Sequence, residues 1–212
     1  MSDLSPGVVE VWAARPQAVS LEYSILSEDE HRRADRFAAC ADRERYRAAR
    51  SWLRCTLSKY AQIPPQRIEF SYGPFGKPML AFPEIPIQFS LTHSGYLALL
   101  AVSAGDPVGA DVEESPGRTL GPAESSLVLS PVELEFIQRS SDPDRAFLTC
   151  WTRKEAFAKV DGRGLERYLK DLTLTDHEGV SQTANGYRLV DLPVPGAIAA
   201  IAVSTGSEVV IR

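Results

Sequence analysis

The chain has 212 residues, of which 44% are hydrophobic and 24% charged, so it is long and apolar enough to bury a globular core. A net charge of −5 argues against a protein that coats nucleic acid or an anionic membrane, and no apolar run reaches membrane-spanning length. Three cysteines without CxxC spacing indicate reduced thiols and a cytoplasmic location, and three scattered histidines argue against a zinc site.

The first half of the chain is predicted to contain one long helical region between strands. That region runs from Ser27 to Tyr60, with a break predicted near residues 38–42. The loop Y-G-P-F-G-K-P and a turn F-S-L-T-H-S, which contains His93, connect later strands. The predicted strands are Val8–Ala13, Arg67–Ser71, Phe89–Leu91, Tyr96–Ser103 and Val108–Val112.

The second half is predicted to begin with helices and to end with strands. The helices Pro131–Arg139 and Pro143–Val160 each have a proline just inside their start, where its missing N–H has no cost. From Asp171 onward, H-E-G and N-G turns separate short strands. Helices that flank runs of adjacent strands favour the α+β fold class.

A faint internal repeat runs through the chain. The fourteen residues from Gly95 match those from Gly196 at seven positions, with a constant offset of 101. The segments L-S-E-D-E and L-S-P-V-E both indicate helix starts capped by a serine and by a glutamate three residues later. We therefore expect two similar lobes, residues 1–105 and 106–212, related by a pseudo-twofold axis, each a mainly antiparallel sheet packed with a long helix. The alternative, that Ala, Val and Ser are simply common in strands, stays open.

Three carboxylates lie in two separate motifs. Asp111 and Glu113, in G-A-D-V-E, are two residues apart on a predicted strand and so share a face. Glu155 and Lys159, in W-T-R-K-E-A-F-A-K, lie on one helical stripe. Acids on one face repel unless a cation separates them, so the set favours Mg²⁺ or Mn²⁺ beside a phosphorylated ligand. A solvent-facing strand end and an ordinary Glu155–Lys159 ion pair are the alternatives. In the repeat, Asp111 aligns with Arg212, so one site is expected.

Two further segments carry candidate ligand contacts. His93 lies between the hydroxyl residues Thr92 and Ser94 in a predicted turn that could aim N–H donors at an anion, although a single histidine is more often structural. Lys77 stands between Gly76 and a proline, where glycine lets the backbone approach a ligand and proline stiffens the loop. The G-x-x-x-x-G-K-[ST] phosphate-binding pattern is absent, so a plain surface loop is the alternative.

These segments together resemble a known family, the Sfp-type 4′-phosphopantetheinyl transferases, in order, spacing and residue identity. The resemblance extends from roughly Arg33 to Leu165. The combination of G-x-D-x-E with W-x-x-K-E-x-x-x-K is specific, whereas any one segment alone would be weak. The resemblance implies two similar α+β lobes with coenzyme A between them. The matching segments are G-K-P at Gly76, F-S-L-T-H-S at Phe89, G-A-D-V-E at Gly109, W-T-R-K-E-A-F-A-K at Trp151 and G-R-G-L at Gly162.

The resemblance also implies an activity. The phosphopantetheine arm of coenzyme A would move to a serine hydroxyl on an apo acyl or peptidyl carrier protein, and adenosine 3′,5′-bisphosphate would leave. The enzyme would be a monomer that needs Mg²⁺, or alternatively Mn²⁺, held by Asp111, Glu113 and Glu155. The catalytic candidates are Glu155 as the base, with Lys159 and His93. The positions expected to contact coenzyme A are Arg33, Arg45, Gly76, Lys77, Thr92, His93 and Lys159.

Some features leave other interpretations open. Thr92 stands where relatives often carry serine, and Tyr46 where some carry a smaller hydroxyl residue, so the adenine-side contacts are undecided. A coenzyme A-binding regulator without transfer, and a metal-dependent coenzyme A hydrolase, are the rival functions. We expect the carrier to dock within Leu120–Ile137, where Leu127–Leu129 is apolar, although core packing explains these side chains equally well.

Overall fold

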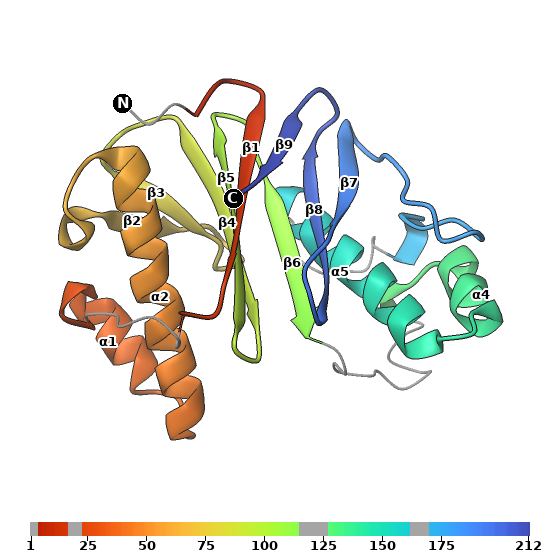
Figure 1. Cartoon of the computed structure of the whole chain (residues 1–212), viewed down its shortest axis with the longest axis horizontal. Helices are drawn as coiled ribbons and strands as arrows, with labels where there is room; N and C mark the ends of the chain where they lie inside the picture. The colour runs from red at the N-terminus through yellow and green to blue at the C-terminus, as the bar shows by residue number, and fades with distance from the viewer. Residues whose placement is uncertain (1–3, 17–22, 115–126, 162–169) are drawn as a thin grey trace.

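The computed structural model describes residues 4–16, 23–114, 127–161 and 170–212 and combines helices with mainly antiparallel sheets (Figure 1). Its helices are α1 (Glu28–Ala34), α2 (Cys40–Ala61), α4 (Pro131–Arg139) and α5 (Pro143–Asp161), with short 3-10 turns at Tyr23–Ile25 and Pro65–Arg67. Its strands are β1 (Val8–Ala14), β2 (Glu69–Tyr72), β3 (Pro78–Phe82), β4 (Ile87–Ser94), β5 (Leu97–Ala104), β6 (Gly109–Glu114), β7 (Tyr187–Leu192), β8 (Ala197–Ser204) and β9 (Glu208–Ile211). The predicted α+β class is confirmed.

Within the described residues, the strands form a sheet in the order β4-β5-β1-β9, a sheet in the order β6-β8-β7 and a separate β2-β3 hairpin. We call the first sheet with α1, α2 and the hairpin the first lobe, and the second sheet with α4 and α5 the second lobe. In each lobe the middle strand, β5 or β8, runs antiparallel to both neighbours. Among the described helices, none is both long and apolar enough to cross a membrane.

The first lobe buries one face of its sheet under a helix. Ser27 caps α1, and its side chain and that of Glu30 exchange hydrogen bonds with each other's backbone N–H. The predicted break in the long helical region is confirmed by the gap between α1 and α2. Leu53 and Leu57 of α2 pack on Phe89 of β4. Burying each such side chain contributes about 1.5–3 kcal/mol, which fixes the helix on the sheet.

The second lobe repeats this construction. Ser130 and Glu133 form the same reciprocal cap at the start of α4, as the sequence predicts. Phe157 and Val160 of α5 pack on Leu189 of β7 and its neighbours. Figure 1 shows α2 and α5 on the outer sides of the molecule, with the sheets between them.

The inner faces of the two sheets form the core that joins the lobes. Val11 of β1 and Leu99 of β5 pack in one cluster with Ala110 of β6 and Ile201 of β8. The last strand adds a second connection, because β9 pairs in parallel with β1 and Arg212 forms an ion pair with Glu10 of β1. The C-terminus therefore lies against the sheet in which the chain begins.

The repeat found in the sequence is out of register by one residue. Leu100 and Val102 of β5 face α2, whereas Ala200 and Ala202 of β8 face α5. Equivalent positions are thus an even number of residues apart, because an offset of 101 would turn every side chain to the opposite face. The buried cations Arg54 and Lys154, which each pair with a capping glutamate, give an offset of 100. The connections before the two middle strands also differ in length. β4 and β5 are joined by a two-residue turn, whereas a longer segment separates the last β7–β8 pair, Leu192 and Ala199.

This register changes the predicted counterpart of Asp111. Asp111 pairs with Ala200 in β8, and Trp12 pairs with the equivalent residue Leu100 in β5. Trp12, and not Arg212, therefore occupies the position of Asp111 in the first lobe. The expectation of a single acidic cluster is unaffected.

Two local predictions also differ from the structure. The strand β3 is absent from the prediction, because its segment P-M-L-A-F has no clear alternation. The predicted strand Phe89–Leu91 lies within β4 and continues to Ser94, so His93 lies on a strand and not in a turn. The hydroxyl residues of this strand alternate with Phe89, Leu91 and His93, which is the pattern of a strand with two different faces.

Candidate active site

The two acidic motifs meet because α5 lies directly against β6. A Cβ atom on Gly109 of β6 would stand 1.9 Å from the carbonyl oxygen of Ala156 and 2.7 Å from the backbone nitrogen of Val160. Real Cβ atoms do not come this close, so the contact requires glycine. It brings Glu155 and Lys159 of α5 beside the strand that carries the other acids.

Asp111 is buried, and only one of its oxygens is satisfied. Oδ1 accepts hydrogen bonds from Thr92 Oγ1 at 3.0 Å and from Lys159 Nζ at 2.6 Å. Oδ2 is buried and has no hydrogen-bond partner among the described residues. Burial raises the pKa of Asp111, and Lys159 and Thr92 oppose that rise. A buried carboxylate oxygen without a partner is costly unless something absent from the protein alone binds it.

Glu113 lies on the same face of β6 and is held by neighbouring donors. Ser94 of β4 donates its hydroxyl to Glu113 Oε2 at 2.8 Å. Burial raises the pKa of Glu113, and the charge of Asp111 adds to this, whereas hydrogen bonds from Ser94 and from Trp151 of α5 oppose it. Donors from β4 and from α5 thus meet at one carboxylate.

The next acid, Glu114, points away from this cluster. Its carboxylate accepts the backbone N–H of Tyr96 at 3.1 Å and forms an ion pair with Arg15 at 2.6 Å. It fills the space beside Gly95, where a Cβ would meet Glu114 Oε2 at 1.9 Å. Glu114 therefore holds the β4–β5 turn.

Glu155 is an acid of the set whose pKa is raised into the neutral range. Its Oε2 lies 4.0 Å from Lys159 Nζ, so the ordinary ion pair considered from the sequence is also present at the limit of contact. Burial, together with the charges of Asp111 and Glu113, raises the pKa of Glu155 to about 7, although Lys159 opposes the rise. Such a carboxylate can accept and release a proton near neutral pH.

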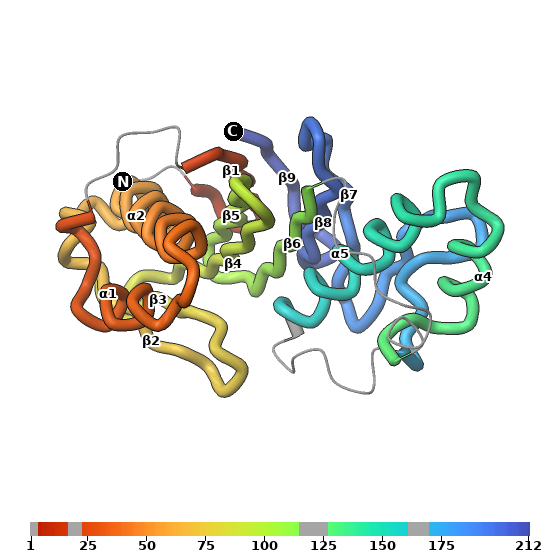
Figure 2. The backbone as a smooth tube through the Cα atoms, turned by 90° about the horizontal axis from the view of Figure 1, so that it is seen from below, coloured from red at the N-terminus to blue at the C-terminus, as the bar shows by residue number. Residues whose placement is uncertain are grey.

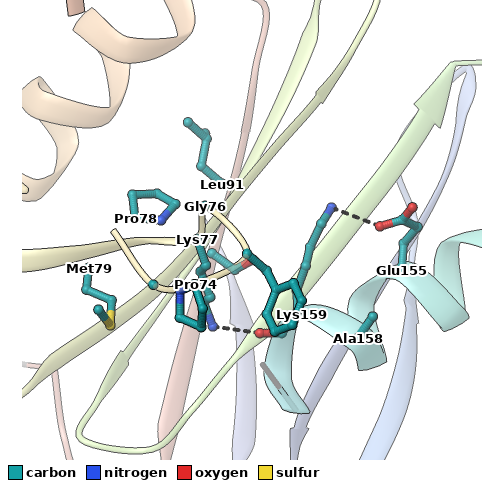
Figure 3. Close-up of a pocket in the computed structure, with 12 residues that line it drawn as sticks. Pro74, Gly76, Lys77, Pro78, Met79, Leu91, Glu155, Ala158 and Lys159 are labelled. Carbon is teal, nitrogen blue, oxygen red and sulfur yellow. Dashed lines mark hydrogen bonds and ion pairs between the residues drawn. The ribbon is translucent and has the colours of Figure 1, made fainter. Parts of the chain in front are cut away.

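A cavity of about 460 Å³ opens beside these residues, between the β2–β3 loop, β4 and α5 (Figure 3). Lys77 fastens the loop across the lobes, because its Nζ donates to the carbonyl oxygens of Val108 at 2.9 Å and Lys159 at 2.8 Å. Figure 2 shows the loop extending out of the first lobe. The walls combine Glu155 and Lys159 with apolar residues that include Pro74, Phe75, Met79, Leu91 and Ala158.

A smaller cavity of about 140 Å³ continues from the first and shares Gly76, Pro78 and Leu91 with it. Arg33 and His93 line this second cavity. Together the two cavities, which we call the recess, extend from Arg33 of α1 to Glu155 of α5.

Arg33 lines the second cavity, whereas Arg45 lies outside it, near His93. The Arg33 guanidinium lies 5.9 Å from the ring centre of Tyr46 and 6.0 Å from that of Tyr72, and no ion pair holds it within the described residues. Arg45 pairs with Asp42 and lies 5.7 Å from the ring centre of Tyr96. A cation that stacks on aromatic rings keeps its N–H donors available for an anion.

Burial in the recess lowers the pKa of His93 and of Lys77. Desolvation, with Lys159 and Arg45 nearby, lowers the pKa of His93, although its side chain remains accessible to solvent. Desolvation and Lys159 likewise lower the pKa of Lys77 to about 8. Mutual repulsion of this kind is relieved when an anion binds.

The structure brings most of the predicted site residues to this recess. Thr92 contacts Asp111, and Lys77 lies in the wall with its ammonium bonded to carbonyl oxygens. In the arrangement described, no three His, Cys, Asp or Glu side chains of the described residues form a group that could hold a metal ion. Sequence reasoning missed Ser94 and the packing role of Gly109, although alternation along F-S-L-T-H-S was a signal for the former.

Two predicted segments fall wholly or partly outside the described residues. The G-R-G-L motif at residues 162–165 lies outside them, as does the first part of the expected docking segment, residues 120–126. Of the remaining apolar tract, Leu127 is 69% exposed, whereas Leu129 is buried against α5. Core packing thus accounts for Leu129.

Comparisons with known proteins agree along nearly the whole chain. A family model described as the 4′-phosphopantetheinyl transferase superfamily matches residues 107–197, and one described as the N-terminal part of a 4′-phosphopantetheinyl transferase matches residues 10–105. The chain is 35% identical over 189 residues to 4′-phosphopantetheinyl transferase HetI of Nostoc sp. (strain PCC 7120), covering 85% of this chain and 79% of HetI. It is 25% identical over 156 residues to 4′-phosphopantetheinyl transferase Sfp of Bacillus subtilis (strain 168), covering 73% of this chain and 68% of Sfp.

Proposed function

The chain belongs to the 4′-phosphopantetheinyl transferase family, and from this premise we propose a Mg²⁺-dependent reaction in the recess between the lobes. The phosphopantetheine arm of coenzyme A is transferred to a serine hydroxyl of an apo acyl or peptidyl carrier protein. The serine oxygen forms a bond to the phosphorus that carries the arm, and the anhydride bond breaks. Adenosine 3′,5′-bisphosphate leaves with that bond's electron pair.

One observation carries this proposal: the buried, partnerless Oδ2 of Asp111 in a cluster of three acids beside a cavity. Carboxylate oxygens are the donors that Mg²⁺ and Mn²⁺ prefer, so Asp111, Glu113 and Glu155 fit either ion chemically. To bind together, these side chains would have to converge further than they do here. Bound there, the ion would neutralise the diphosphate and stabilise the leaving group.

Glu155 is the proposed general base. Its raised pKa, about 7, matches the task of taking the serine proton near neutral pH. Lys159, which lies between Asp111 and Glu155, supplies positive charge to the phosphate oxygens during transfer. His93, which lines the smaller cavity from β4, is proposed to contact the phosphate oxygens together with Lys159.

The first lobe is proposed to hold the nucleotide end of coenzyme A. Arg33 is suited to the 3′-phosphate because its guanidinium is free of ion pairs within the described residues and lines the smaller cavity. The other residues predicted to contact coenzyme A are Arg45, Gly76, Lys77 and Thr92. The substrate then lies between the lobes predicted at residues 1–105 and 106–212.

Incubation with coenzyme A, Mg²⁺ and a panel of apo carrier proteins tests the proposal. Mass spectrometry is expected to show a carrier serine that has gained the phosphopantetheine arm. Binding of coenzyme A without a gain on any carrier would instead support a regulator. Release of adenosine 3′,5′-bisphosphate in the absence of a carrier would support a hydrolase.

Substitution of the acids tests the roles of individual residues. Asp111→Ala and Glu155→Gln are each expected to remove most activity, with a loss of about 10²–10⁴-fold for the base. Glu114→Gln is a matched control, because Glu114 is the neighbouring acid that faces the β4–β5 turn instead. Near-normal turnover of Glu155→Gln at saturating Mg²⁺ would remove Glu155 from the chemistry. Circular dichroism checks that the variants remain folded.

A further inference from the structure

Ser94 is not among the predicted ligand contacts, yet its hydroxyl touches both the backbone of β6 and one of its acids. We propose that Ser94 is a positioning residue that fixes the Glu113 carboxylate for the divalent cation. The inference rests on the proposed function, because it concerns the same metal-binding acids.

The direction of the hydrogen bonds supports this role. A serine hydroxyl has one proton to donate and lone pairs to accept. The backbone N–H of Glu114 donates to Ser94 Oγ at 3.2 Å, and Ser94 Oγ donates to Glu113 Oε2 at 2.8 Å. Since the N–H occupies a lone pair, the hydroxyl proton is directed at the carboxylate. Ser94 therefore fixes one oxygen of Glu113 by a bond anchored in the same strand.

The neighbouring hydroxyls along β4 show how specific this arrangement is. Ser90, Thr92 and Ser94 all face β6, because they are two residues apart on one strand. Ser90 Oγ accepts the backbone N–H of Ala110 at 3.0 Å. Thr92 contacts the Asp111 carboxylate. Of the three, Ser94 bonds both a backbone N–H of β6 and an acid among the described residues.

Anchoring a ligand carboxylate affects how tightly it binds an ion. A carboxylate held in one orientation loses less rotational freedom on binding, and loss of such a supporting hydrogen bond weakens metal affinity by about 10–100-fold. Ser94 lies on the first lobe, whereas Glu113 belongs to the second. The first lobe thereby contributes to the geometry of a cation site whose acids all come from the second.

Direct binding of Mn²⁺ tests the inference. The concentration of free Mn²⁺ is measured by electron paramagnetic resonance during titration of the full chain with coenzyme A present. The variants are Ser94→Ala, Ser94→Thr, which keeps the hydroxyl, and Ser90→Ala, which removes a cavity-lining hydroxyl that accepts a backbone N–H of β6. Thermal unfolding of each variant measures its cost in stability.

The expected result separates positioning from packing. Ser94→Ala should raise the Mn²⁺ Kd by about tenfold or more, Ser94→Thr should restore it towards the original value, and Ser90→Ala should leave it unchanged. Equal affinity in the original protein and in Ser94→Ala would overturn the inference, as would equal weakening by Ser90→Ala. Failure of the original protein to bind Mn²⁺ would instead overturn the proposed metal role itself.

Discussion

The two lobes share one construction, but only the second carries the acids. In both, a capping glutamate at the start of one helix reaches a buried cation on the long helix. Glu30 contacts Arg54 at 2.7 Å in the first lobe, and Glu133 contacts Lys154 at 2.9 Å in the second. These buried pairs fasten the shorter helix to the longer one in each lobe.

The two lobes differ in what the next lysine contacts, about one helical turn after Arg54 and Lys154. Lys59 of α2 and Lys159 of α5 are 100 residues apart and occupy equivalent positions. Lys59 Nζ lies 5.3 Å from the ring centre of Trp12, whereas Lys159 Nζ lies 2.6 Å from Asp111 Oδ1. Trp12 and Asp111 are themselves equivalent, since they pair with matching residues of β5 and β8. The same lysine therefore packs on an aromatic ring in one lobe and neutralises a buried acid in the other.

Removal of the capping acids should have the largest effect on stability. Glu133→Gln removes the carboxylate that pairs with the buried Lys154, whose Nζ also donates to the carbonyl oxygen of Leu172, and a loss of about 3–5 kcal/mol in the free energy of unfolding is expected. Glu30→Gln should cost a comparable amount, because its carboxylate pairs with two buried guanidinium groups, those of Arg50 and Arg54. Urea unfolding followed by circular dichroism measures both. A loss below about 1 kcal/mol in either variant would contradict the prediction.

The equivalent lysines give the sharpest test of function. Lys159→Met should lower kcat by about 10²–10³-fold, because it removes positive charge from the phosphate oxygens at transfer. Lys59→Met, which affects only the contact with Trp12, should retain the rate of carrier modification. Both rates are measured with one carrier at saturating coenzyme A and Mg²⁺. Similar losses in the two variants would show that the lysines support folding alone.

The pH dependence of stability should reveal the acids of the second lobe. Since burial raises the pKa of Glu155 from 4.5 to about 7, the folded protein holds this proton more tightly than the unfolded chain does. The stability from this group is fully present below about pH 4.5 and is lost as the pH rises towards 7, by up to about 3 kcal/mol. Metal-free unfolding of the original protein and of Glu155→Gln between pH 4.5 and 8 measures it. An unchanged slope in the variant would rule out Glu155 as the source.

Substitution of Arg33, in the first lobe, should have a smaller effect, and this effect is on the KM for coenzyme A. Arg33→Ala should raise the KM for coenzyme A by about tenfold through loss of a charge-assisted contact, with little change for the 3′-dephospho form. Arg32→Ala is the control, because Arg32 is exposed and pairs with Glu28 and Asp29 on its own helix. Equal losses with both substrates would remove Arg33 from the 3′-phosphate.

Local patterns predicted much of the fold. The serine and glutamate of each capping box, and prolines at helix starts, located α1, α4 and α5 because capping depends on residues within one helical turn. Prediction was weaker for β3 and for the segment around His93. There, strand pairing depends on residues far away in the chain, so neither segment could be assigned from its own neighbours.

The sequence by itself determined the family, the motifs and the alternation that sets Asp111 and Glu113 on one face. Each of these depends on residues that are close together in the chain. Only the tertiary structure decided that Gly109 lets α5 touch β6, that Ser94 reaches Glu113, and that the repeat has an offset of 100. These features depend on contacts between distant segments. A single residue of slip in a strand reverses its faces, and the folded sheets, with helices on their outer sides, are what fix that register.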